Sequence, residues 1–204
     1  GFLLGLSRTR KSQNHRVRQD TVFCGQGSLL RLKMGSIMKP LIVVSSKTGN
    51  TRVIARALQD GIGPCDYVEA SQVPADLSAY NPIVLCFWCD RGMAPEDTKA
   101  VAKRIKGKDI ACFATMGGDP ENPKAKDWMH RTSMTLVEAG EDNTLKLEFL
   151  CRGRIDPELF ARMTAMMGGE VTPEREARRK QSETHPDRLD ALAAVRTYQD
   201  VFGA

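Results

Sequence analysis

Short aliphatic runs alternate with helical segments from residue 38 onward, and this alternation restricts the possible folds more than any other feature. The clearest runs cover residues 41–44, 83–88 and 110–115. They are almost free of polar residues, as is typical of strands buried on both faces. Strands that alternate with helices form parallel sheets covered on both sides. The sequence therefore predicts an α/β fold.

Weaker patterns complete this sheet and supply its helices. Residues 67–69 are a weak edge-strand candidate, and residues 145–150 alternate between apolar and polar side chains, which predicts a fifth strand. Apolar residues recur at helical spacing from Val53 to Ile62, where Gly61 and Gly63 stop the helix. Further helices are predicted at residues 95–105 and 122–139.

The carboxyl-terminal part has a different character. Residues 152–183 are predicted to form an added helical arm, made of a methionine-rich helix that ends near Met167 and a charged helix that ends near Gln181. A last helix at residues 186–202 is expected to complete the α/β layer. Its predicted packing face consists of Leu189, Leu192, Val195, Tyr198 and Phe202, at spacings of three and four residues.

The formal net charge of +5 is concentrated at the amino terminus. Residues 1–37 carry seven of the 30 basic residues but one of the 25 acidic residues, so residues 38–204 are nearly neutral. Binding of nucleic acid requires a basic face, which in the sequence only residues 1–37 offer, so no binding of nucleic acid is predicted. Residues 1–37 also lack periodicity. We expect a disordered or non-native extension; a targeting peptide and a basic arm are the alternatives.

The cysteines indicate a reducing compartment. They lie mostly in apolar, strand-like runs, no secretory signal peptide is evident, and reduced thiols in a cytoplasmic protein are therefore predicted. No apolar run is long enough to span a bilayer. Cys86 and Cys89 have the spacing of a redox dithiol, but Cys86 lies inside a predicted strand. The two thiols are thus expected to point in different directions. No four-ligand zinc spacing is present and no histidine lies near a cysteine pair, so no metal site is predicted.

The segment Ser46-Lys47-Thr48-Gly49-Asn50-Thr51 follows the first predicted strand and leads into the first helix. Unpaired N–H groups and the helix dipole favour an anion at this position. Gly49 allows the backbone to curl around an oxyanion, hydroxyl groups add donors, and Asn50 can hold the shape of the loop. The fingerprints of triphosphate and dinucleotide loops are both missing. A monoester phosphate is the predicted ligand; a capped turn without a ligand is the alternative.

This segment matches the phosphate loop of flavodoxins, T/S-x-T-G-x-T, and the chain resembles that family from Met38 to Leu150 and, in outline, in the last helix. The resemblance implies a three-layer sandwich with a five-stranded parallel sheet of order 2-1-3-4-5, which binds FMN at its carboxyl edge. Three loops would hold FMN. Their residues are Ser45, Ser46, Lys47, Thr48, Gly49, Asn50 and Thr51; Trp88, Cys89, Asp90, Arg91 and Gly92; and Thr115, Met116, Gly117, Gly118 and Asp119.

Two of these positions decide how the flavin ring would be held. By the resemblance, Trp88 lies where flavodoxins stack an aromatic ring on the flavin, and a place for Trp88 in the core is the alternative. Flavodoxins commonly place a second aromatic residue after the fourth strand. This chain has Met116 and two glycines there, which would leave the outer face of the flavin less covered or free for a partner.

Further segments are similar to flavodoxin-like proteins associated with bacterial bilirubin reductase: residues 87–92 and 150–156, the methionine-rich helix, residues 172–174 and 185–187. The resemblance implies FMN-based electron transfer to a redox partner protein, a reductase subunit, with bilirubin as a possible substrate. The flavin would perform the chemistry, and no catalytic residue is predicted. The alternatives are a flavin-dependent NAD(P)H or quinone reductase and a flavin-free interaction subunit.

Overall fold

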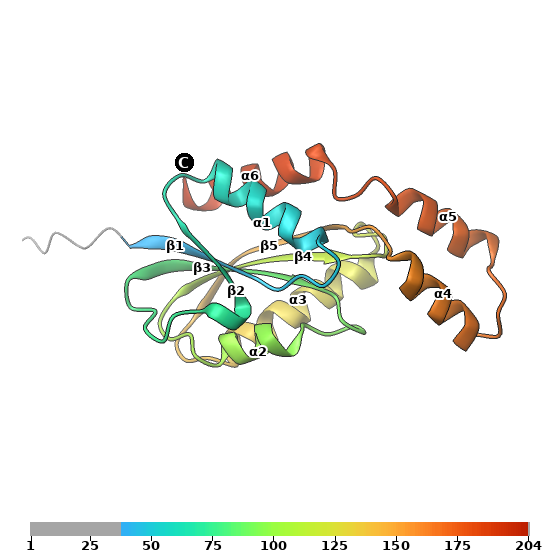
Figure 1. Cartoon of the computed structure of the whole chain (residues 1–204). Helices are drawn as coiled ribbons and strands as arrows, with labels where there is room; N and C mark the ends of the chain where they lie inside the picture. The colour runs from blue at the N-terminus through green and yellow to red at the C-terminus, as the bar shows by residue number, and fades with distance from the viewer. Residues whose placement is uncertain (1–37, 204) are drawn as a thin grey trace, which may run out of the picture. The chain divides into compact units, whose positions relative to one another are not determined.

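The computed structural model describes residues 38–203, and the extension expected at residues 1–37 lies outside the described residues. Five parallel strands form one sheet of order β2-β1-β3-β4-β5, which confirms the predicted topology (Figure 1). The strands are β1 (Lys39–Val44), β2 (Asp66–Glu69), β3 (Tyr80–Trp88), β4 (Asp109–Met116) and β5 (Thr144–Arg152).

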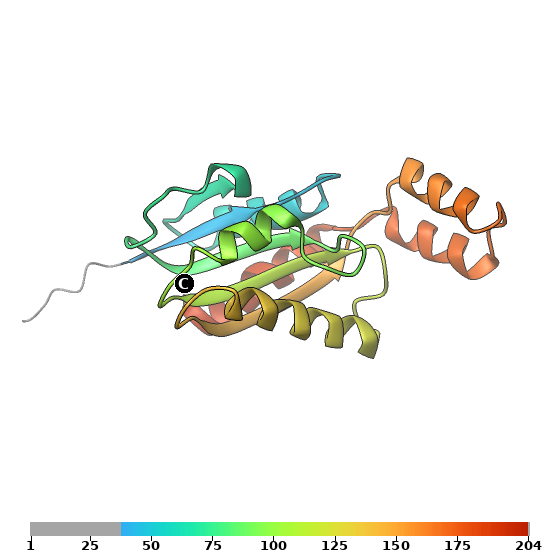
Figure 2. The ribbon, with the colours of Figure 1, turned by 90° about the horizontal axis from the view of Figure 1, so that it is seen from below.

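Helices cover both faces of this sheet. Helices α1 and α6 lie on one face and α2 and α3 on the other, as Figures 1 and 2 show from two directions. A hairpin of α4 and α5 lies beyond the carboxyl ends of the strands. The helices are α1 (Asn50–Gly61), α2 (Glu96–Ala102), α3 (Pro123–Glu138), α4 (Pro157–Met166), α5 (Pro173–Ser182) and α6 (Arg188–Phe202), with a 3-10 helix at Ala70–Gln72.

Strand β1 shows why the sheet has two cores. Its aliphatic side chains alternate between the faces, so Leu41 and Val43 join the cluster under α2 and α3, whereas Ile42 and Val44 join the cluster under α1 and α6. All four are almost completely buried. Each such side chain stabilises the fold by about 1.5–3 kcal/mol through the removal of apolar surface from water. The continuous aliphatic run is thus explained by burial on both sides.

Helix α6 packs closely on α1, through part of the face that the sequence predicts. Tyr198 is buried as predicted, and Val195 and Phe202 pack against the same cluster. Leu189 and Leu192 are exposed by 73% and 47%, so the prediction was wrong for these two leucines, whereas Ala194, which it omitted, is completely buried. A Cβ atom on Gly61 of α1 would lie 2.7 Å from Cγ1 of Val195. Small residues at the contact therefore set how closely the two helices approach, and the large leucines lie outside it.

Helix α2 is shorter than the predicted helix at residues 95–105. It ends at Ala102, after which the amide groups of Arg104 and Ile105 bond to carbonyl groups three residues earlier, at 2.9 and 3.1 Å. This tighter turn brings Ile105 into the core, where it is 1% exposed. The apolar side chain of Ile105 thus extends the helical pattern in the sequence beyond the helix itself.

The arm of α4 and α5 has its own start signals and one buried attachment point. The side chains of Asp156 and Thr172 accept hydrogen bonds from the first turns of α4 and α5. Ser182, at the end of α5, is completely buried and its Oγ accepts a bond of 3.0 Å from the Ile155 amide. The attachment fixes the arm at the end of β5 and leaves the methionines of α4 largely exposed.

The described cysteines are free thiols, and Cys24 lies outside the described residues. Cys86 packs in the cluster on the α1 side, whereas Cys89 packs against the cluster on the opposite face. The two thiols therefore point in different directions, as the sequence predicts. Within the described range, no helix is long and apolar enough to cross a membrane.

The buried thiols should be inert in the folded chain. Burial raises the pKa of Cys86 and Cys151 far above the ordinary range and that of Cys112 to about 12. We expect N-ethylmaleimide at about pH 8 to modify these three cysteines only after unfolding in guanidinium chloride, as mass spectrometry of the peptides would show. Rapid labelling of Cys112 in the folded chain would contradict this burial.

The same thiols also make the stability of the fold depend on pH. In the unfolded chain they ionise above about pH 8.5, whereas in the folded chain they stay neutral, because their folded pKa values are raised. The unfolded state therefore loses protons first. These thiols therefore do not change the free energy of unfolding below about pH 8.5, and they lower it as the pH rises above that value.

Candidate functional site

The carboxyl ends of β1, β3 and β4 bring the three predicted loops to one edge of the sheet. The sheet order reverses between β1 and β3, because β2 lies on the outer side of β1 while the later strands continue beyond β3. Ligands of open α/β sheets bind at such a switch point. A cavity of about 1010 Å³ opens there.

The loop after β1 has the conformation of an anion-binding turn. Gly49 has a φ of 94°, a left-handed conformation that suits glycine, and a Cβ atom at this position would meet nothing within 4 Å. Helix α1 begins directly after it without a capping side chain, whereas α3, α4, α5 and α6 all begin with one. The amide groups of Asn50 and Thr51, the first two of α1, therefore remain available for an external acceptor, whereas the Arg52 amide donates to Ser46.

The hydroxyl groups of this loop have different surroundings. Ser45 is buried, and its Oγ donates a 2.9 Å hydrogen bond to Asp97. Thr51 is also buried, and its Oγ1 lies 2.9 Å from Oγ1 of Thr115 at the end of β4. Ser46 is half-buried and accepts a bond of 3.3 Å from the Arg52 amide. Thr48 is exposed and lines the cavity. It is the loop hydroxyl that is placed best for a phosphate.

Asn50 connects this loop to the segment after β5. Its Nδ2 donates to Oγ1 of Thr48 at 3.2 Å and to the carbonyl oxygen of Arg154 at 2.9 Å. A Cβ atom on Gly153 would lie 2.8 Å from Nδ2 of Asn50, so the backbone approaches closely. This contribution of residues 153 and 154 to the site was not predicted from the sequence. Its only signal was a glycine between two arginines.

Trp88 ends β3 and forms one wall of the cavity. It is half-buried, unlike Phe87 before it, which is fully buried in the core. Nζ of Lys47 lies 5.3 Å from the centre of the Trp88 ring, within the range of a cation–π contact. The indole ring therefore lies between the predicted phosphate loop and the loop that follows β3.

The loop after β3 is a tight turn. The amide and carbonyl groups of Asp90 and Met93 form two hydrogen bonds of 2.9 Å, while Arg91 and Gly92 have φ values of 51° and 82°. The Trp128 indole donates a 2.8 Å bond to the Gly92 carbonyl and fixes the turn to α3. The Arg91 side chain is 92% exposed and lies 4.0 Å from Asp90. Burial raises the pKa of Cys89 beside the turn.

The loop after β4 also lines the cavity. Met116, Gly117 and Gly118 line the cavity, and a Cβ atom on Gly117 would lie 2.8 Å from Cγ1 of Ile155. The Met116 carbonyl accepts a bond of 2.8 Å from the Gly153 amide. The glycines therefore allow the end of β4 and the segment after β5 to lie close together, with no bulky ring between them.

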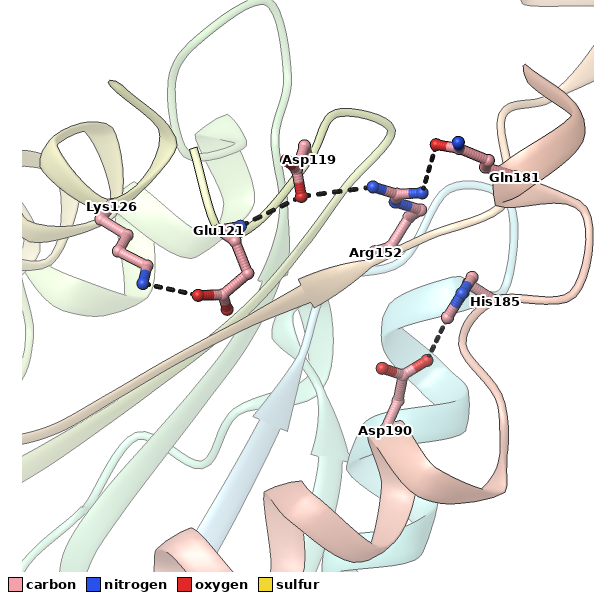
Figure 3. A network of polar contacts seen from close by, with 7 residues as sticks. All are labelled: Asp119, Glu121, Lys126, Arg152, Gln181, His185 and Asp190. Carbon is pink, nitrogen blue, oxygen red and sulfur yellow. Dashed lines mark hydrogen bonds and ion pairs between the residues drawn. The ribbon is translucent and has the colours of Figure 1, made fainter. Parts of the chain in front are cut away.

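Asp119 lies outside this cavity. Figure 3 shows its carboxylate beside Arg152, with Oδ1 of Asp119 and an Arg152 nitrogen 3.3 Å apart, while Arg152 also donates to Gln181 at 3.1 Å. Asp119 thus connects the loop after β4 to α5 instead of lining the cavity. Of the other predicted residues, Gly49, Ser45, Ser46 and Thr51 do not line the large cavity, although Ser45 and Ser46 line a neighbouring one of about 330 Å³.

A cluster of metal-ligand types occurs near the start of α6. His185, Asp187 and Asp190 lie close together, but Asp187 accepts bonds from two amides of α6 and Oδ2 of Asp190 accepts from the Asp187 amide at 2.8 Å. Nδ1 of His185 lies 2.6 Å from the same Asp190 atom (Figure 3). These groups are thus engaged in a helix cap.

The family model of the flavodoxin domain matches residues 41–199, which cover all the strands except the beginning of β1, and all three loops. The chain belongs to the flavodoxin family. Members of this family bind flavin, so the family assignment supports a flavin-binding redox function.

One relative of this chain is the flavodoxin-like domain-containing protein BilS from Clostridioides difficile (strain CD3). It is 29% identical over 167 residues, which cover 77% of this chain and 92% of BilS. Among solved structures, an archaeal flavodoxin matches with a TM-score of 0.48 and 18% identity, over 80% of this chain and 96% of that chain. A NAD(P)H:quinone oxidoreductase from Methanothermobacter marburgensis matches with a TM-score of 0.41 and 12% identity, over 74% and 98%.

The arm also lines the cavity, although the sequence did not predict that the arm lies at the site. Side chains of α4 and α5 form the wall that faces the three loops. A prediction based on periodicity cannot bring the arm to the sheet edge, because the turn after β5 sets its direction. From the arm, the cavity is lined by Leu159, Phe160, Arg162, Met163, Met166, Arg175 and Arg178.

Proposed function

We propose that this chain binds FMN at the switch point and transfers electrons within a reductase system. The observation that carries the proposal is one arrangement: the uncapped start of α1 after Gly49 opens toward the same edge of the sheet as the face of Trp88. An anion site beside an aromatic wall matches a ligand with a phosphate at one end and a flat ring at the other.

The phosphate would bind at the loop after β1. Amide groups at the start of α1 and the Thr48 hydroxyl supply neutral donors, and Asn50 holds Thr48 in place. Lys47, which is exposed above Trp88, supplies a positive charge nearby. Donors of this kind form charge-assisted hydrogen bonds with a phosphate, which are about twice as strong as neutral ones.

The ring would lie between Trp88 and the wall formed by Met116 and the two glycines. FMN, when bound, supplies the electron chemistry, and the chain orients the ring and controls its contact with water. Because Gly117 and Gly118 carry no side chains, the face of the ring opposite Trp88 is open toward the arm. The open face is where we expect electron exchange with a second molecule.

We further propose a cytoplasmic reductase subunit as the partner and bilirubin as the final substrate of the system. The similarity of residues 87–92, 150–156 and 185–187 to proteins associated with bilirubin reductase supports this substrate class.

An assay of NAD(P)H oxidation by the FMN-loaded chain alone tests whether the chain is an electron carrier or a reductase. We expect no turnover without a reductase, because a carrier does not bind the nicotinamide itself. Rapid turnover by the chain alone would identify a self-sufficient reductase instead.

Titration with FMN, followed by the change in flavin absorbance, tests the binding site directly. We expect the full chain to bind FMN, and Trp88→Ala to weaken binding by about tenfold or more, since stacking on an aromatic side chain contributes about 1–3 kcal/mol. Trp88→Phe should retain most of the affinity, because it keeps an aromatic face. Equal FMN affinity in a folded Trp88→Ala variant would place Trp88 outside the flavin site.

A further inference from the structure

The cavity has a second half that the proposed FMN site does not use. Its volume of about 1010 Å³ is at the upper end of the range for pockets that hold a drug-sized ligand. The loops after β1, β3 and β4 form one half, and the arm forms the other. The space between the arm and the open ring face is therefore available for a second molecule.

The arm half combines apolar side chains with arginines. Leu159, Met163 and Met166 of α4 are exposed by 39%, 48% and 87%, although each lines the cavity. Exposed apolar groups of this size indicate a binding surface, and methionine adapts to flat, irregular ligands. Phe160 adds an aromatic ring, with the Arg175 guanidinium 5.3 Å from its centre.

The charges of the cavity are strongly unbalanced. Among the described residues, no carboxylate lies within ion-pair distance of Arg154, Arg162 or Arg178. One of the two lining carboxylates, Asp156, already accepts the Leu159 amide at the start of α4. Six cations and two carboxylates line the cavity: Lys47, Arg91, Arg154, Arg162, Arg175 and Arg178 against Asp90 and Asp156.

We propose that the arm half of the cavity binds an apolar organic anion, a molecule with a flat hydrophobic body and one or more carboxylate or sulfonate groups. The methionines and Phe160 contact the body, and Arg162 and Arg178 pair with the acidic groups. The proposal goes beyond FMN binding, because it assigns a second ligand. It rests on the proposed function only for the position of the flavin ring beside this ligand.

Two dyes that differ by a charge test this site. 8-Anilinonaphthalene-1-sulfonate is an apolar anion, and N-phenyl-1-naphthylamine has the same ring system without the sulfonate. We expect the full chain, saturated with FMN, to bind the anionic dye at least tenfold more tightly than the neutral dye in calorimetric titrations. Equal affinities, or complete loss of dye binding when FMN is saturating, would overturn the proposal.

Paired variants separate charge from apolar contact. Arg162→Gln with Arg178→Gln should weaken binding of the anionic dye about tenfold and leave the affinity for the neutral dye unchanged. Arg188→Gln with Arg196→Gln removes the same charge from α6, where neither residue lines either of the two cavities described above, and should change neither affinity. Met163→Gln with Met166→Gln should weaken both dyes. An identical loss in both arginine pairs would show a nonspecific charge effect and overturn the assignment.

The titrations also keep this proposal separate from the proposed function. FMN affinity is measured in the same preparations. If FMN does not bind but the anionic dye binds in a manner that depends on Arg162 and Arg178, the FMN proposal fails and the anion site remains. If FMN binds and the dye affinities do not depend on these arginines, the anion site fails and the FMN proposal remains.

Discussion

FMN is expected to bind at least about a hundredfold more tightly than riboflavin, which has the same ring but no phosphate. Hydrogen bonds to a charged group contribute about 1.5–3 kcal/mol each, so two bonds from the start of α1 and Thr48 account for this ratio. Parallel titrations of the full chain with both ligands, followed by flavin absorbance, would measure it. Equal affinities would remove the phosphate site from the loop after β1.

A substitution of Thr48 tests whether the loop after β1 causes the difference in affinity between FMN and riboflavin. Thr48→Val should weaken FMN and leave riboflavin unchanged, because only FMN uses the Thr48 hydroxyl. Thr197→Val is the matched control, since the Thr197 hydroxyl on α6 bonds to the carbonyl of Ala193 in its own helix, at 2.7 Å. If Thr48→Val lowers the affinities for FMN and for riboflavin to the same extent, the substitution disturbs the ring site instead of the phosphate site.

The strands and the order of the loops could be predicted from the sequence because their signals are local. A run such as residues 41–44 is apolar throughout, because each face of the sheet is covered. The strand can therefore be recognised from these residues alone. The phosphate loop is likewise one continuous segment. Its left-handed Gly49 and the adjoining helix start are properties of a few neighbouring residues.

The directions of side chains could not be predicted in the same way. Ser45 and Thr51 are among the residues predicted to hold the phosphate, but both hydroxyls are buried and bonded to Asp97 and Thr115, residues that are distant in sequence. The predicted face of α6 included Leu189 and Leu192, which are exposed, and omitted Ala194, a small residue that is completely buried. Periodicity gives weight to large side chains and misses contacts made by small ones.

The contribution of the arm to the cavity depends on distant segments as well. Residues 153 and 154 direct the chain from β5 toward the arm, and Asn50 holds that turn through the Arg154 carbonyl. Arg152 adds bonds to Asp119 and Gln181, which join three segments of the chain (Figure 3). None of these contacts has a periodic pattern, so the basic and apolar wall of the cavity is evident only in the structure.

Gly140→Ala is expected to destabilise the fold by about 2–4 kcal/mol and to lower the melting temperature by on the order of 10 °C. A Cβ atom on Gly140 would lie 2.3 Å from the Ile105 carbonyl oxygen and 2.9 Å from that of Ala102. Both obstacles are backbone atoms that cannot rotate away. The Ile105 carbonyl also accepts bonds from the Glu141 amide and Nδ2 of Asn143, at 3.1 and 2.9 Å. A shift of this carbonyl would break both bonds.

Gly107→Ala provides the matched comparison for this glycine. Gly107 lies in the neighbouring turn, has a φ of 61°, and has open space around its Cβ position. Its substitution adds only the strain of a left-handed residue, about 1 kcal/mol. Thermal unfolding followed by circular dichroism should therefore rank wild type above Gly107→Ala and Gly107→Ala above Gly140→Ala. If Gly140→Ala melts at or above the temperature of Gly107→Ala, then the turn after α3 is free to move, and the close contact between Gly140 and Ile105 does not limit stability.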